Sequence, residues 1–175
     1  MSALTAVEIR GLLESLNSEL AKTGTVGELY LVGGAVMCLA LSARPSTQDI
    51  DAVFRPATKI RAAAKRVAAA AGVDPYWLND GVKGYLSAQG DFAPFLDLSH
   101  LRIMVAEPPY LFAMKCLAMR LGAEFHDEED VRFLLRLLDV RSYEQALKII
   151  ARYYPLERIP QKTLYALEEL LPKAT

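Results

Sequence analysis

Two carboxylates one residue apart, Asp49 and Asp51, have the type and spacing of residues that bind a cation. In residues 49–54 strand alternation places them on one face and the apolar Ile50 and Ala52 on the other. Two like charges side by side in a half-buried position repel each other, and a bound cation relieves this cost. Mg²⁺ prefers carboxylate oxygens together with substrate phosphate oxygens. The alternative is a pair of edge-strand charges that face the solvent.

A glycine pair, Gly33-Gly34, lies upstream between the apolar run 28–32, which predicts a buried strand, and the helical pattern 35–41. Glycines at the start of a helix let the backbone approach a phosphate, and the helix N-terminus offers free N–H groups. Ser46 and Thr47 add hydroxyl donors for the same phosphates. A lone glycine pair is also typical of a tight turn, whereas this ordered series predicts a phosphate and metal site.

Residues 31–35 (Leu-Val-Gly-Gly-Ala) and 46–51 (Ser-Thr-Gln-Asp-Ile-Asp) resemble the signature of the polymerase-β-like nucleotidyltransferase superfamily. Within it the chain is similar to the AbiEii-type branch, which includes nucleotidyltransferase toxins of bacterial toxin–antitoxin pairs, and to a bacterial nucleotidyltransferase family of unknown function. The resemblance covers residues 29–138. It implies transfer of a nucleoside monophosphate from an NTP, with Mg²⁺ or Mn²⁺, to a tRNA, protein or small-molecule acceptor, and a cognate antitoxin as partner.

Residues 110–115 and 127–135 support the resemblance, which implies that Lys115 contacts nucleotide phosphate and that Asp130 contributes to the active site. On its own pattern, Lys115 belongs to an apolar helix and either extends to the rim or points into a site. Asp127 and Asp130 open the next helix, where carboxylates are favourable for capping alone. Capping explains Asp127 better than Asp130, which shares a helical face with Leu134.

The family pattern usually includes a third carboxylate on a later strand, and Asp97, between Leu96 and Leu98, is the candidate metal ligand. Its strand register is open, and Asp91 and Glu107 are the fallback acids. A third acid within reach of the metal favours catalysis. An outward Asp97 favours a non-catalytic nucleotide- or partner-binding module of the same fold. A plain α/β scaffold with accidental motifs is the remaining alternative.

Other polar and aromatic residues have simpler interpretations. Neither His100 nor His126 has a second histidine or cysteine at ligand spacing, so both suit surface roles. Trp77, with nearby tyrosines, is either a platform for a base or part of the core. A tRNA acceptor would need exposed cations, for which the candidates are Lys59, Arg61, Lys65, Arg66, Lys83 and Arg102.

The whole chain has 175 residues, 53% of them hydrophobic, and a formal net charge of -1, so its overall balance does not favour a nucleic-acid or membrane surface. No apolar run is long enough to span a bilayer. Two isolated cysteines favour a reducing, cytoplasmic location. Strand patterns occur at 28–32, 49–54, 95–98 and 101–105, and helical patterns at 4–20, 35–41, 57–71, 108–121, 127–138, 142–153 and 161–171.

This order of elements predicts an α/β (α+β) fold, in which helices flank a small mixed sheet and the C-terminal part is helical. We expect residues 1–140 to form a nucleotidyltransferase-like domain and residues 141–175 to form C-terminal helices packed on the same domain.

Overall fold

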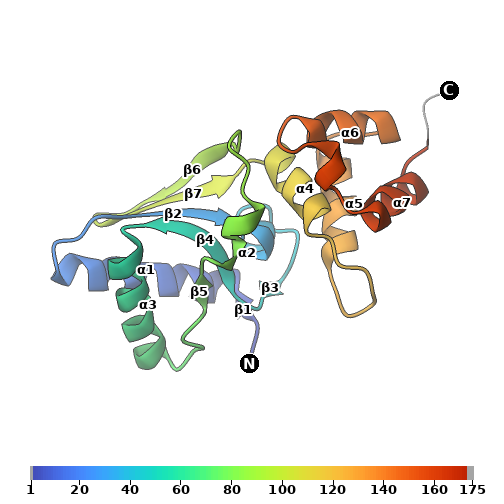
Figure 1. Ribbon diagram of the computed structural model, residues 1–175. Helices are drawn as coiled ribbons and strands as arrows, with labels where there is room; N and C mark the ends of the chain where they lie inside the picture. The colour runs from blue at the N-terminus through green and yellow to red at the C-terminus, as the bar shows by residue number, and fades with distance from the viewer. Residues whose placement is uncertain (1, 173–175) are drawn as a thin grey trace. The chain divides into compact units, whose positions relative to one another are not determined.

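The computed structural model describes residues 2–172, and every strand in that range precedes residue 107 (Figure 1). The elements in chain order are β1 (Leu4–Thr5), α1 (Ala6–Lys22), β2 (Gly27–Val32), α2 (Gly33–Leu39), β3 (Ser46–Thr47), β4 (Ile50–Arg55), α3 (Ala57–Ala71), β5 (Leu78–Asn79), η1 (Gly81–Tyr85), β6 (Phe92–Asp97), β7 (Leu101–Ala106), α4 (Pro108–Leu117), α5 (Asp127–Leu137), α6 (Tyr143–Ala151), η2 (Leu156–Arg158) and α7 (Gln161–Leu170). Within residues 2–172, every helix is too short or too polar to cross a lipid bilayer.

The main sheet has five strands in the order β5-β4-β2-β7-β6. Strand β2 is antiparallel to β4 and parallel to β7, β4 is parallel to β5, and β6 is antiparallel to β7. The predicted mixed α/β architecture is therefore confirmed. A separate two-stranded sheet pairs β1 with β3. It was not predicted, because two-residue strands are too short to show a period in the sequence.

The chain divides into two compact units, of which the first contains residues up to Gly84 together with Phe92–Ala106. Helices α1 and α3 pack against each other on one face of its sheet (Figure 1). Along β4 the residues Ile50, Ala52 and Phe54 are buried, while Asp51 is half-buried. This period of two confirms the predicted alternation, and it directs Asp51 away from the apolar set.

The second unit contains Tyr85–Asp91 and the helices after Ala106. Helix α4 packs against both α5 and α6, and α7 packs on α6. The segment Tyr85–Asp91 is held to these helices by tyrosines: Tyr153 Oη donates to Asp91 at 2.7 Å, and Ser87 N donates to Tyr110 Oη at 3.0 Å. Hydrogen bonds to Tyr110 of α4 and to Tyr153, which follows α6, thus join this early segment to the second unit.

Several boundaries differ from the expected ones, two of them by more than a helix end frays. The units do not divide at residue 140, because α4 and α5 belong to the second unit through their contacts with each other and with α6. Helix α4 ends at Leu117 rather than near residue 121. Its continuation is prevented because Arg120 N donates to the Asp127 carboxylate at 3.0 Å instead of to a helical carbonyl.

Candidate functional site

Asp49 and Asp51 lie at the end of the sheet where β2 finishes and β4 begins. The register pairs Asp51 with Val32, the last residue of β2, and on its other side with Asn79 of β5. Asp49 precedes β4 by one residue, and Asn79 Nδ2 donates to its Oδ2 at 3.1 Å. Both aspartates are half-buried. The structure therefore brings the two carboxylates to one end of the sheet, next to the amide of Asn79.

The glycine pair begins α2 directly after β2, so the predicted strand–glycine–helix order is confirmed. Gly33 has a left-handed φ of +67°, and a methyl group on it would lie 3.2 Å from Asp51 Oδ2. A methyl group on Gly34 would lie 2.7 Å from both Arg44 Nη1 and Thr47 Oγ1. Because glycine has no side chain, these polar groups can lie close to the turn. We call these residues the strand-end cluster: Gly33, Gly34, Arg44, Thr47, Asp49, Asp51 and Asn79.

Of the two hydroxyls expected near the phosphates, the structure places one in the cluster. Thr47 is buried beside Gly34, and its Oγ1 donates to the Asp49 carbonyl at 3.3 Å. Ser46 precedes it on β3 opposite Thr5, and successive strand residues point to opposite sides. A phosphate contact by Ser46 stays a prediction.

Sequence analysis missed two members of the cluster. These are Arg44 and Asn79, which no pattern in the sequence assigned to the site. The available signals were weak: a single cation between the α2 pattern and the D-x-D motif, and a polar residue directly after the apolar pair Trp77-Leu78. A guanidinium group is well suited to phosphate because its N–H donors form a planar fork.

Asp97 does not join the cluster. It pairs with Arg102 on β7, and Arg102 pairs with Glu28 at the start of β2. Glu28 in turn faces Arg55, the last residue of β4. Asp97 is therefore about 13 Å from Asp51 along the strand direction and three strand spacings of about 4.8 Å across the sheet. Its side chain is 75% exposed, and Asp97 is corrected from metal ligand to surface acid.

The cluster supplies two carboxylates to a cation. Within residues 2–172, no group of three or more His, Cys, Asp or Glu side chains is arranged to hold a metal ion. Mg²⁺ typically binds through one or two protein carboxylates and completes its coordination with substrate phosphates and water. Asp49 and Asp51 fit this mode, in which the cation is bound together with a nucleotide.

Lys115 and Asp130 lie in the second unit, in an ion-pair group that also contains the buried Asp127 and the exposed Arg120. Lys115 Nζ is 2.6 Å from Asp130 Oδ2 and 3.4 Å from Asp127 Oδ1, and its side chain is 10% exposed. Asp127 also accepts hydrogen bonds from Arg120 N and Nε. Burial raises the pKa of Asp127, but these hydrogen bonds and the charges of Lys115 and Arg120 outweigh it and hold the pKa below its usual value.

The sequence left open whether Lys115 extends to the rim or points into a site. In the structure its ammonium group contacts the buried carboxylates of Asp127 and Asp130. Asp127 is the member that sequence analysis assigned to capping alone, since burial is not visible in a run of four acidic residues. A role for Lys115 and Asp130 at a nucleotide stays a prediction.

The remaining candidates have structural or surface roles. Trp77 is 1% exposed and its Nε1 donates to the Ala64 carbonyl at 2.9 Å, so it is a core residue. His126 contacts Glu129 on the surface, and His100 contacts Ser99. Among the cations proposed for tRNA, four form ion pairs with acids of the first unit: Arg61, Arg66, Lys83 and Arg102.

The chain matches no known family model, no curated protein and no solved structure. The chemistry of the strand-end cluster is therefore the basis for a functional assignment. It combines a glycine turn, a guanidinium group and a hydroxyl with two adjacent carboxylates, which are groups suited to a phosphorylated ligand and its cation.

Proposed function

We propose that the strand-end cluster binds a nucleoside triphosphate with Mg²⁺ or Mn²⁺ and transfers its nucleoside monophosphate to an acceptor. One observation carries the proposal. The pairing of Val32 with Asp51 puts the turn Gly33-Gly34 and the carboxylates of Asp49 and Asp51 at the same end of the sheet. Phosphate-binding groups and cation-binding groups are then adjacent.

Each group has a role that follows from its chemistry. Asp49 and Asp51 would hold the cation, which would supply charge neutralisation at the phosphates when bound. Arg44, beside Gly34, donates hydrogen bonds to the phosphates, and Thr47 adds one when its hydroxyl turns from the Asp49 carbonyl. The acceptor oxygen bonds to the α-phosphorus while the bond to the α,β-bridging oxygen breaks. The acceptor proton passes to solvent, pyrophosphate leaves, and the protein contributes positioning and charge stabilisation.

The acceptor is a tRNA, a protein side chain or a small molecule, as the resemblance to AbiEii-type nucleotidyltransferases implies. The same resemblance implies a cognate antitoxin and a phosphate contact by Lys115. The ion pairs of Arg61 and Arg66 leave less free positive charge on α3 for a tRNA than the sequence suggested. We assign the protein to the cytoplasm, since both cysteines are free and buried.

A second candidate function is nucleotide or partner binding without transfer. It is favoured by the position of Asp97 at the opposite end of the sheet, which leaves two acids in the cluster, and by the amide of Asn79 beside Asp51. A site with two carboxylates can hold a cation on a nucleotide and still lack the third acid that catalysis by this superfamily usually employs.

The first experiment measures the melting temperature with each of the four NTPs, with and without Mg²⁺, because a ligand that binds only the folded state raises it. The wild type is compared with Asp51→Asn, and Asp97→Asn is the matched control with the same charge change at the other end of the sheet. We expect the wild type and Asp97→Asn to be stabilised by NTP with Mg²⁺, weakly by Mg²⁺ alone, and Asp51→Asn to lose this response.

Transfer is then tested with NTP labelled on the α-phosphate and with tRNA or protein as acceptor. Label that moves to an acceptor in the wild type and not in Asp51→Asn supports nucleotidyl transfer. Stabilisation without any labelled product supports the second candidate. The absence of stabilisation by all four nucleotides would refute nucleotide binding in both candidates and leave partner binding alone.

A further inference from the structure

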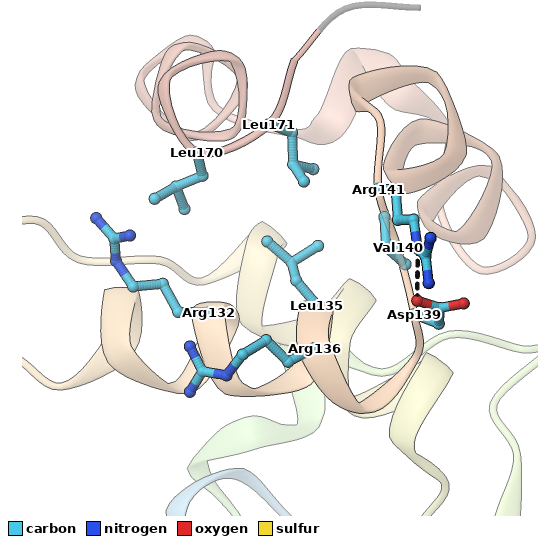
Figure 2. Close-up of a pocket in the computed structure, with 8 residues that line it drawn as sticks. All are labelled: Arg132, Leu135, Arg136, Asp139, Val140, Arg141, Leu170 and Leu171. Atoms are coloured by element: carbon cyan, nitrogen blue, oxygen red, sulfur yellow. Dashed lines mark hydrogen bonds and ion pairs between the residues drawn. The ribbon is translucent and has the colours of Figure 1, made fainter.

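A cavity of about 340 Å³ lies in the second unit, beside the last turn of α5, the connection to α6 and the end of α7 (Figure 2). Its apolar wall contains Leu135, Val140 and Leu171, which are all buried, together with the half-buried Leu170. The volume is at the lower end of the range for ligand sites, which is roughly 300–1,000 Å³. The cavity thus offers room for a single large apolar side chain or a small ligand.

Three arginines surround this apolar wall: Arg132 and Arg136, one helical turn apart on α5, and Arg141 after it (Figure 2). All three are exposed. Arg132 pairs with Glu128 at 2.9 Å and Arg141 with Asp139 at 2.8 Å, in exposed ion pairs that contribute about 0–1 kcal/mol and exchange readily. Among the described residues 2–172, Asp139 is the single acid that lines the cavity, so this part of the lining carries an excess of positive charge.

We propose that this cavity binds an acidic peptide segment of a partner protein, with a large apolar side chain in the cavity and carboxylates on the three arginines. The arrangement has the anatomy of a protein interface, an apolar centre with a charged rim, and arginine is enriched at the residues that dominate binding energy. A small free anion fits less well, because the exposed guanidinium groups are screened by salt and water. A peptide combines several such contacts with burial of an apolar group.

The test selects peptides from a randomised displayed library on the full chain, and measures their affinity by fluorescence polarisation. We expect selected peptides to combine acidic residues with a large apolar residue. They should bind Arg132→Glu/Arg136→Glu at least about tenfold more weakly than the wild type. Leu170→Ser should weaken binding through the apolar wall. Lys148→Glu, an exposed charge reversal on α6 outside the cavity, is the matched control and should bind as the wild type does.

Three results would overturn the proposal: selected peptides without acidic enrichment, equal affinity for Arg132→Glu/Arg136→Glu and the wild type, or stronger binding of an RNA dodecamer than of the peptides to the same arginines. Melting temperatures of the variants show whether each has folded. The proposal is independent of the proposed nucleotide site, because none of its residues belongs to the strand-end cluster.

Discussion

Substitution of Gly33 by alanine tests whether the glycine turn positions Asp51. Gly33 has a φ of +67°, a conformation that costs a residue with a Cβ roughly 1–2 kcal/mol. Alanine also restricts the unfolded chain, which returns about 0.4–1 kcal/mol, so the net loss of stability is about 1 kcal/mol. For a chain of this size, that loss lowers the melting temperature by about 2–4 °C.

The second effect is local, because the added methyl group would lie 3.2 Å from Asp51 Oδ2. The carboxylate must shift by a few tenths of an ångström, whereas Mg²⁺ requires nearly ideal octahedral geometry. We expect an affinity loss of about tenfold for NTP with Mg²⁺, as for disturbed metal-site neighbours. At a ligand concentration of 100 times the wild-type Kd, the stabilisation by ligand would then fall from about 2.7 to about 1.4 kcal/mol.

Gly72→Ala is the matched control. Gly72 has a φ of +70°, but a methyl group there would meet no atom within 4 Å. Both variants should lose similar stability without ligand, and only Gly33→Ala should lose part of the ligand-induced rise in melting temperature. An unchanged rise in Gly33→Ala would refute the argument that this turn positions Asp51. An equal loss of the rise in Gly72→Ala would assign the effect to general destabilisation.

Three further predictions concern the second unit. Lys115→Met should lower the free energy of unfolding in urea by about 3–5 kcal/mol, because it leaves the buried Asp130 without its cation, and Lys115→Met/Asp130→Leu should lose less than the sum of the single variants. Asp127 has a lowered pKa, so its contribution to stability is present above its unfolded pKa and is lost as pH falls through the folded value; the free energy of unfolding of Asp127→Asn should therefore decrease less on acidification. Burial and the hydrogen bond to Asp91 raise the pKa of Tyr153 to about 12. Its contribution to stability is therefore complete below its unfolded pKa and is lost as pH rises towards 12. In alkaline denaturation the free energy of unfolding of Tyr153→Phe should decrease less than that of the wild type.

Much of the fold was predictable because its signals are local. The alternation in residues 49–54 predicted the buried face of β4. The order of a strand, a glycine pair and a helix was also readable, since each step involves neighbouring residues. These patterns depend on the repeat of a single strand or helix and on turn chemistry, which the sequence contains in full.

The composition of the site depended on contacts between distant segments. Asp97 has apolar residues on both sides in the sequence, as a residue of a buried strand does. The pairing of β6 with β7 nevertheless places it at the far end of the sheet from Asp51. Asn79 contacts Asp49 because β5 pairs with β4. Arg44 lies beside Gly34 because the residues between them fold back on the turn. The sequence by itself determined which residues could bind a phosphate and a cation. The tertiary structure decided which of them meet, because strand order and register are set by burial and pairing across the whole sheet.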